Sequence, residues 1–398
     1  MAATIAPNTP QPSSTSLRQN TALKTGLFAV AHTINDTYPN LYPILLPELM
    51  AQMHFGTAAA GFISTAAALT TQLLQPVMGY EADRLGGRLF VVGGLVVGSL
   101  LTGAALGLAP SYWLLVAVLL LAGLGNAAFH PHASAIVGEM AGKRKGFGMS
   151  LFMIGGNFGR ALAPIVAAGA FMVGGRLGLL TVAIPGLIMA LVMAWVMVPA
   201  PVPKPRKGPL LTPEFLRGLR EAGSLLLVVG LRNMAALTVL TLVPIWYKAT
   251  GRPLTEAAAM LSLLFLAGSV GNMAGGAASD RFGAKPVMIG SALLSSLLLA
   301  AFLSVKSGFL SLVLVALLGA ALYSTGSVVM VFGQALFPEN RSMASGLTLG
   351  IGNTIGSFGV AAMGLIAQYY SPVVGLWVTA GALLLSIPFV LRLKEATR

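Results

Sequence analysis

Two copies of one loop decide the architecture: Gly79–Arg88, GYEADRLGGR, and Gly276–Lys285, GAASDRFGAK. Position 79 repeats at position 276, an offset of 197 residues in a chain of 398. In both copies a glycine precedes Asp-Arg, and a second glycine and a basic residue follow. Soluble solenoids repeat every 20–50 residues or so. A period of half the chain therefore indicates two duplicated halves.

Apolar runs occupy most of the remaining sequence. The chain is 56% hydrophobic and only 9% charged, whereas a soluble domain carries about 25% charged residues. A spanning helix needs about 20 apolar residues, and twelve runs approach that length. They are 25–50, 57–80, 89–109, 112–140, 146–173, 177–199, 222–249, 256–279, 286–304, 309–337, 343–369 and 373–391. We predict an all-α integral membrane protein with twelve transmembrane helices in two pseudo-symmetric six-helix bundles.

The domain boundaries follow from the polar segments. Residues 1–23 are predicted to form a cytoplasmic tail, because they are polar and lack the apolar core of a signal peptide. The prolines and charges of 200–221 mark a cytoplasmic linker. The N-terminal bundle then covers 24–199, the C-terminal bundle 222–391, and a second cytoplasmic tail 392–398.

The basic residues fix the predicted orientation. With both termini and the linker on one side, that side collects eighteen Lys and Arg, against four on the other. The eighteen are Arg18, Lys24, Arg84, Arg88, Lys143, Arg144, Lys145, Lys204, Arg206, Lys207, Arg217, Arg220, Arg281, Lys285, Arg341, Arg392, Lys394 and Arg398; the four are Arg176, Lys248, Arg252 and Lys306. Cytoplasmic loops carry such an excess, so both termini are predicted to be cytoplasmic.

Composition also excludes several classes of protein. The chain has no cysteine, which rules out disulfides, thiolate metal sites and cysteine nucleophiles. The net charge of +13 is spread over short loops, so no nucleic-acid partner is expected. We find no nucleotide loop, nucleophile elbow or metal cluster, and therefore expect no enzyme activity and no cofactor.

The loop at Gly79–Arg88 resembles the signature of the major facilitator superfamily. Within it, the chain is most similar to the fosmidomycin resistance protein family of bacterial exporters. Four stretches carry that likeness: HTIND (32–36), LQPVMG (74–79), GLGNAAFHP (123–131) and GGNFGRALAP (155–164). The chain departs from the superfamily at Leu119, where an arginine is usual, and at Arg160, which is unexpected in this family.

The resemblance implies a monomeric secondary transporter of the bacterial inner membrane. It implies that the first, fourth, seventh and tenth spans line a central cavity, and that export is driven by protons. We predict proton-coupled antiport of a small anionic or amphipathic compound by alternating access. The alternatives are proton-coupled uptake of an anionic nutrient, a channel and a membrane-embedded enzyme.

Asp36 and His32 are the candidate proton-coupling residues. Asp36 lies about 17 Å into its span at 1.5 Å per residue, near the bilayer centre, where a carboxylate costs on the order of 3 kcal/mol. His32 is one turn earlier on the same face. The alternative is that Asp36 caps a backbone kinked by Pro39, Pro43 and Pro47.

Arg232 and Arg160 are candidate ligands for an anionic cargo. The 197-residue offset aligns Arg232 with Asn35, and Pro244 with Pro47. Arg232 is therefore expected to face Asp36 across the cavity, as cargo ligand or as a static ion pair. Arg160 either reaches the cavity or extends toward the outer surface.

Four polar side chains complete the expected cargo site: Asn126, His130, Tyr38 and Tyr323. His130 shares a helix face with Asn126. His132, two residues on, projects from another face, so the two histidines are not expected to share a metal ion. Single polar residues also serve as contacts between helices.

The repeated loops supply the expected gate. Its residues are Asp83, Arg84 and Arg88 in the first copy, and Asp280 and Arg281 in the second. Asp83 is expected to accept from the N-terminal end of a helix near residues 342–345 when the cytoplasmic side is closed. A solvated turn is the alternative.

Overall fold

The computed structural model describes residues 21–75, 77–78, 81, 87–140, 145–197, 222–305, 308–336 and 346–393. Across these residues the regular secondary structure is helical throughout. The helices of the first half are α1 (Thr21–Thr37), η1 (Tyr38–Asn40), α2 (Tyr42–Met53), α3 (Thr57–Leu73), α5 (Gly87–Leu108), α6 (Tyr112–Met140), α7 (Lys145–Gly178), η3 (Leu179–Val182) and α8 (Ala183–Val196). Those of the second are α10 (Gly223–Ala249), α11 (Leu254–Phe282), α12 (Ala284–Ser304), α13 (Phe309–Tyr323), α14 (Gly326–Leu336), η4 (Gly346–Ile351), α16 (Gly352–Tyr369), α17 (Pro372–Leu384) and α18 (Ser386–Arg392).

These helices make the twelve predicted crossings. Eight stretches in the described part of the chain are long and apolar enough to span a membrane. One of them, Gly148–Val196, contains two crossings, because the chain turns at Gly174 and Gly175, where Gly175 has a φ of +56°. The other three crossings are shorter or interrupted: residues 21–53, 57–73 and 346–369. The predicted tails and linker lie almost entirely outside the described residues, so their boundaries stay predictions.

Proline breaks the first span, which the sequence predicts as one run. α1 ends at Thr37, a 3₁₀ turn with Pro39 at its start follows, and α2 begins at Tyr42 with Pro43 next. Proline lacks an N–H and so leaves helix carbonyls without donors. The Asn40 side chain donates to one of them, the Asp36 carbonyl, at 2.8 Å.

Close backbone contact joins α1 to α7. A Cβ at Gly155 or Gly159 would collide with the carbonyl of Ala29 or Thr33. The Thr33 hydroxyl donates to the Gly155 carbonyl at 2.9 Å, and the Thr37 hydroxyl donates to the Gly159 carbonyl at 3.2 Å. Small residues and hydroxyl bonds of this kind drive helix association in membranes. They hold α1 and α7 together as one unit.

The second half repeats this packing with α10 on α16. A Cβ at Gly356 would collide with the Gly230 carbonyl. The Asn233 amide donates to the Asn353 carbonyl at 2.7 Å. These contacts support the duplication that the loop motif predicts.

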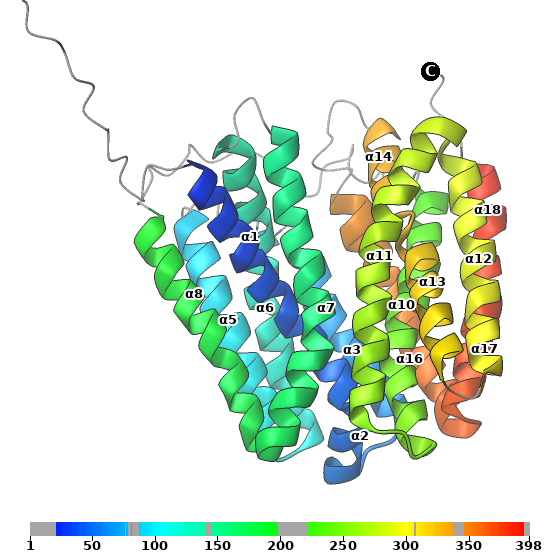
Figure 1. The fold of residues 1–398 in the computed structure, drawn as a ribbon, viewed down its shortest axis with the longest axis horizontal. Coiled ribbons are helices and arrows are strands. Elements are labelled where there is room, and N and C mark those ends of the chain that lie inside the picture. Colours follow the sequence, from blue (N-terminus) through cyan, green and yellow to red (C-terminus); the bar gives the residue numbers. More distant parts are fainter. Residues whose placement is uncertain are drawn as a thin grey trace, which may run out of the picture.

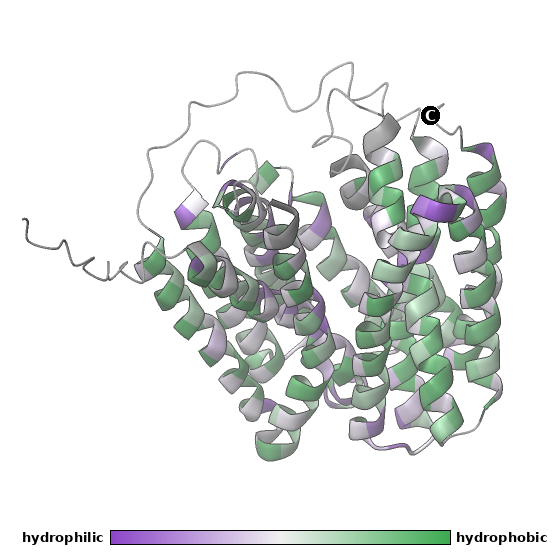
Figure 2. Cartoon of the chain, turned by 45° about the horizontal axis from the view of Figure 1, so that its top comes forward, coloured by the Kyte–Doolittle hydropathy of each residue, from purple (hydrophilic) through white to green (hydrophobic). Residues whose placement is uncertain are grey.

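The two halves converge at one end and diverge toward the end where the C-terminus lies (Figure 1). Figure 2 shows that hydrophobic residues dominate the outer faces of the helices. Large apolar side chains are exposed there, among them Val173 and Phe309, which are 92% and 80% accessible. Lipid, not water, is the solvent that suits such a surface.

Hydrogen bonds between the halves hold the converging end. The hydroxyls of Ser64 on α3 and Thr241 on α10 lie 2.8 Å apart. The next residue of α3, Thr65, donates its hydroxyl to the Ser357 carbonyl of α16 at 2.6 Å. α3 therefore contacts two helices of the opposite half.

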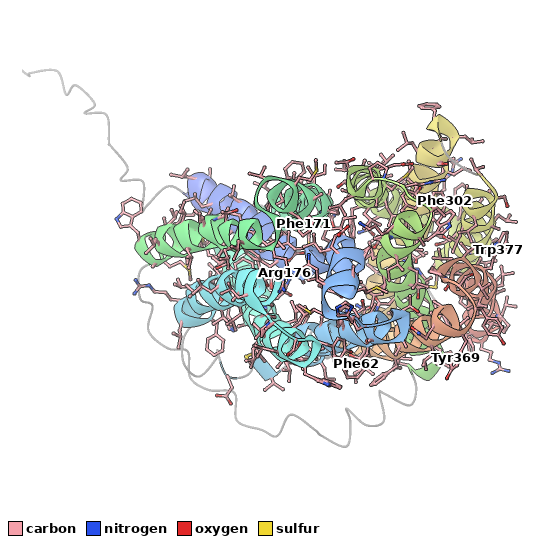
Figure 3. All side chains as sticks on the ribbon, turned by 90° about the horizontal axis from the view of Figure 1, so that it is seen from below. Phe62, Phe171, Arg176, Phe302, Tyr369 and Trp377 are labelled. Carbon is pink, nitrogen blue, oxygen red and sulfur yellow. The ribbon has the colours of Figure 1, made fainter. Side chains whose placement is uncertain are left out.

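An ion pair and a cavity lie at the same end. The Lys248 ammonium on α10 is 2.6 Å from the Glu48 carboxylate on α2. Beside them is a cavity of about 360 Å³ that both halves line. Phe171, one of its lining residues, is seen near the junction of the halves from this end (Figure 3).

We predict that Gly159→Val destabilises the protein, because its new side chain would meet the Thr33 backbone. Overpacking of this kind costs about 1–3 kcal/mol. Gly169→Val is the matched control, because a Cβ at Gly169 on the same helix α7 has no neighbour within 4 Å. Melting temperatures in detergent should fall for Gly159→Val only; equal values for the two variants would contradict the packing of α1 on α7.

Candidate functional site

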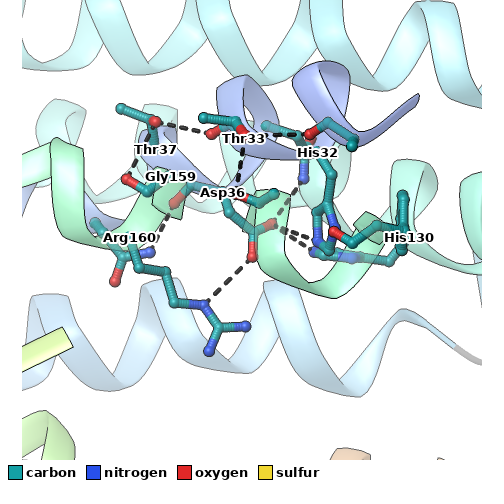
Figure 4. A network of polar contacts seen from close by, with 12 residues as sticks. His32, Thr33, Asp36, Thr37, His130, Gly159 and Arg160 are labelled. Carbon is teal, nitrogen blue, oxygen red and sulfur yellow. Dashed lines mark hydrogen bonds and ion pairs between the residues drawn. The ribbon is translucent and has the colours of Figure 1, made fainter. Parts of the chain in front are cut away.

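Asp36 is the centre of a polar cluster inside the N-terminal half (Figure 4). It occupies the last turn of α1, and only 2% of the residue is exposed. A buried carboxylate in a membrane span is costly unless donors surround it. This burial places Asp36 inside the N-terminal bundle, and its position near the bilayer centre stays a prediction.

Four nitrogen groups surround the carboxylate. His130 Nε2 lies 2.9 Å from Asp36 Oδ1, His32 Nε2 lies 3.4 Å from it, and Asn35 Nδ2 donates to it at 3.3 Å. Arg160 Nε donates to the other oxygen, Oδ2, at 3.3 Å. His32 Nε2 makes no hydrogen bond among the described residues. The donors are Asn35 of α1, His130 of α6 and Arg160 of α7, so three helices hold one charge.

His32 is fixed by α7 on its other side. Its Nδ1 is 2.7 Å from the Phe152 carbonyl, which can only accept, so Nδ1 carries the hydrogen. The ring stacks on Phe152 with 3.9 Å between centroids. Gly156 leaves room for it, because a Cβ there would collide with the imidazole. The predicted pairing of His32 with Asp36 on one helix face is confirmed.

The two histidines of α6 project in different directions, as the sequence predicts. His130 meets Asp36, whereas His132 packs against Phe90 with 5.3 Å between ring centroids. His32, Asp36 and His130 instead offer three possible metal ligands within 4.8 Å. Arg160 places a fixed positive charge on the same carboxylate, which opposes a divalent cation.

The structure corrects the expected pairing of Asp36 with Arg232. The ion pair forms with Arg160, and an Arg232 Nη donates to the Leu322 carbonyl on α13 at 2.5 Å. Successive residues on a helix are about 100° apart. Arg232 aligns with Asn35 and so leaves its helix in a different direction from Asn233, the residue that aligns with Asp36.

Tyr323 on α13 lies near both arginines. Its hydroxyl interacts electrostatically with Arg160 of the N-terminal half and with Arg232 of the C-terminal half. Arg160 therefore lies near a residue of the opposite half, and its access to the cavity stays a prediction. The 197-residue offset aligns Tyr323 with Asn126, so the two expected cargo ligands occupy equivalent places.

Tyr38 and Asn126 lie within the N-terminal half. The Tyr38 hydroxyl donates to the Val182 carbonyl at 3.1 Å, so that group serves packing instead of the expected cargo contact. Both residues line a cavity of about 20 Å³, which is room for about one water molecule. The Asn126 amide is buried there without a protein partner among the described residues.

The expected gate is only partly within the described residues. Asp83, Arg84 and the helix end near residues 342–345 lie outside them. Arg88 donates to the Ala194 carbonyl at 2.6 Å. Asp280 and Arg281 are exposed at the end of α11, where the Arg281 guanidinium lies 5.2 Å from the Phe282 ring. The gate stays a prediction.

The sequence analysis missed three partners of the site: Asn35, Thr33 and Thr37. One pattern could have revealed the threonines. Thr33 and Thr37 are four residues apart, as are Gly155 and Gly159, and matched spacings of four indicate two helix faces in contact. Asn35 carries no such pattern.

Comparison with known proteins agrees with this geometry. The family profile described as Major Facilitator Superfamily matches residues 28–251 and again 225–398. The chain is 28% identical to the fosmidomycin resistance protein of Escherichia coli (strain K12) over 91% of this chain and 92% of that protein. It is 27% identical to the uncharacterized MFS-type transporter YfnC of Bacillus subtilis (strain 168), over 88% and 90%.

Solved structures share the fold. The nucleoside transporter NupG superposes with a TM-score of 0.76 at 14% identity, covering 94% of this chain and 99% of that one. A bacterial homolog of the human lysosomal transporter Spinster, inward-facing and unoccupied, gives 0.73 at 16%, covering 95% and 99%. With twelve crossings, an internal repeat and two matches to one profile, this chain belongs to the Major Facilitator Superfamily.

Proposed function

We propose that this transporter exports a small anionic or amphipathic compound in exchange for protons, by alternating access of its two halves. The observation that carries the proposal is the Asp36 cluster, a carboxylate with two histidines and an arginine buried inside a bundle of membrane helices. Export is supported by the similarity to the fosmidomycin resistance protein over most of the chain.

The proposed orientation places both termini in the bacterial cytoplasm, on the side that carries eighteen basic residues against four. The halves diverge toward that side (Figure 1) and are joined at the opposite end by Ser64–Thr241 and Glu48–Lys248. In this orientation the molecule faces the cytoplasm, ready to load cargo for export.

The proposed cargo site lies between Arg160, Tyr323 and Arg232. The two guanidinium groups come from opposite halves and share the neighbourhood of one hydroxyl. Guanidinium binds carboxylate and phosphate groups through a rigid fork of donors. An anion held by both would be contacted by both halves, as rocking about a central ligand requires.

Arg160 links the cargo to the proton. It is the ion-pair partner of Asp36, so an anionic cargo competes with Asp36 for the same guanidinium. A proton that binds in the cluster changes the strength of the ion pair between Asp36 and Arg160. This in turn changes the affinity of Arg160 for the cargo. By linkage, the cargo changes the affinity for the proton by the same factor.

Proton-coupled uptake of an anion is the second candidate, and the charge balance favours it. Asp36 and Arg160 cancel, so an added proton makes the cluster positive and strengthens anion binding. The two functions are distinguished by fosmidomycin flux in proteoliposomes that contain the protein in one known orientation, with the lower pH on the periplasmic side. Export predicts that fosmidomycin is driven out of the cytoplasmic compartment, whereas uptake predicts accumulation there.

Asp36→Asn should abolish transport driven by a pH gradient while leaving the protein inserted in the membrane. The neutral amide keeps the shape but removes the charge on which His130 and Arg160 converge. Radiolabelled fosmidomycin flux in proteoliposomes measures the effect, with Glu139→Gln, at an exposed carboxylate near the end of α6, as control. Undiminished flux in Asp36→Asn would remove this residue from the mechanism.

Arg232→Ala and Arg160→Ala should each weaken binding of an anionic cargo by about 2–5 kcal/mol, the usual loss for a buried charged partner. Isothermal titration of the purified protein with fosmidomycin checks this. Arg176→Ala is the matched control, because Arg176 donates to the Leu106 and Ala109 carbonyls at the end of α5. Equal affinity in all three variants would contradict the cargo site.

A disulfide between Ser64→Cys and Thr241→Cys should stop transport. The native hydroxyls are 2.8 Å apart, close enough for Cβ atoms to reach disulfide geometry, and the chain has no other cysteine. Oxidation should fix the converging end closed, and reductant should restore flux. Each single variant should keep its flux under oxidant. Full flux in the cross-linked protein would exclude opening at this end.

A further inference from the structure

We propose that His130 is the group that takes up the transported proton, and that Asp36 remains ionised throughout the cycle. This inference rests on the proposed proton coupling and specifies its chemistry. The sequence alone assigned the proton to Asp36, with help from His32. The contacts around the Asp36 carboxylate favour His130 as the group that binds the proton.

Both oxygens of Asp36 are already occupied by donors. Oδ1 is 2.9 Å from His130 Nε2 and accepts from Asn35 Nδ2 at 3.3 Å, while Oδ2 accepts from Arg160 Nε at 3.3 Å. Hydrogen bonds to the charged form stabilise it. A proton on Oδ1 would displace one of its two donors, and a proton on Oδ2 would remove the negative charge that holds Arg160. The carboxylate is therefore the counter-ion of the cluster and not its proton carrier.

His32 is closed off from any aqueous path. Only 3% of its side chain is exposed, its ring lies flat on Phe152, and Nδ1 is committed to the Phe152 carbonyl. On its remaining side the edge of His130 approaches, with 4.9 Å between ring centroids. Among the described residues, His32 is therefore a less accessible point of entry for a proton than His130.

His130 has the access that the other two lack. Its side chain is 22% exposed, against 3% for His32 and 3% for Asp36. Since Asp36 can only accept, His130 Nε2 carries a hydrogen whether the ring is neutral or charged. Uptake at Nδ1 therefore converts the ring to imidazolium without breaking the 2.9 Å contact. Protonation therefore changes the charge of the His130 ring without moving it away from Asp36.

The charges facing His130 limit the cluster to one proton. They are His32 and Asp36 from α1 and Arg160 from α7, with Tyr323 of α13 beyond Arg160. Asp36 and Arg160 cancel each other, so one imidazolium leaves a net charge of +1. A second, on His32 with its ring 4.9 Å away, would oppose the first. The imidazolium also gives Asp36 a second full counter-ion beside Arg160.

Histidine NMR of the full chain in nanodiscs tests the proposal directly. With ¹⁵N-labelled histidine, and His130→Gln used for assignment, the His130 nitrogen shifts should change with pH as the ring takes up a proton. Infrared difference spectra against Asp36→Asn should show no carboxylic acid band from Asp36 across the same titration. The proposal would be overturned if the His130 nitrogen shifts did not change with pH, or if a carboxylic acid band from Asp36 appeared as the pH was lowered.

Transport gives the second readout. In proteoliposomes with fosmidomycin as the probe, His130→Gln replaces the ring that binds the proton with an amide that can still donate to Asp36. Its gradient-driven flux should fall to the level of protein-free vesicles, and its pH profile should become flat. His132→Gln, on the same helix but packed on Phe90, should keep the native profile. A native profile in His130→Gln would refute the assignment.

These outcomes separate this inference from the proposed function. If the native protein moves no protons, proton coupling fails, and the NMR titration still decides whether His130 binds one. If the native protein is proton-coupled and His130→Gln is equally so, only the assignment to His130 fails.

Discussion

One buried negative charge organises the N-terminal half. In a medium with little water, the carboxylate of Asp36 needs donors on every side, and α1, α6 and α7 supply them. Those helices must approach closely enough for side chains to reach. The glycine contacts of α7 with α1 make that approach possible. Electrostatics and packing therefore act together, and neither would produce the site alone.

The sequence predicts the fold well, because lipid imposes long apolar runs and the repeat fixes their grouping. The break at Gly174 and Gly175 falls between the predicted runs 146–173 and 177–199. The first span shows where such prediction stops. The hydropathy of the sequence predicts one continuous span. In the structure, Pro39 and Pro43 divide this span into three helical segments, and the first segment ends just after Asp36. A hydropathy average over about twenty residues does not detect such prolines, although they determine where the helix ends.

The site was predicted less completely. Pairs within one helix, such as His32 and Asp36, follow from spacing alone. Contacts between side chains of different helices depend on how each helix is rotated about its own axis. The 197-residue offset fixes this rotation only to the nearest residue, which corresponds to about 100°. Arg232 shows the consequence, because one position of difference from the Asp36 equivalent sends its side chain to Leu322 and leaves Arg160 as the ion pair.

The duplication is uneven at the level of chemistry. The C-terminal counterparts of His32, Asp36 and His130 are Val229, Asn233 and Ser327, none of which titrates near neutral pH. At these three positions the acid–base groups occur in the N-terminal copy alone, and Arg232 lies next to the C-terminal counterpart of Asp36. Under the proposed proton coupling, substitutions in the C-terminal half would change cargo selectivity and leave the titratable groups of the N-terminal half intact. The two duplicated halves would then differ in task, one binding the proton and the other adapting to the cargo.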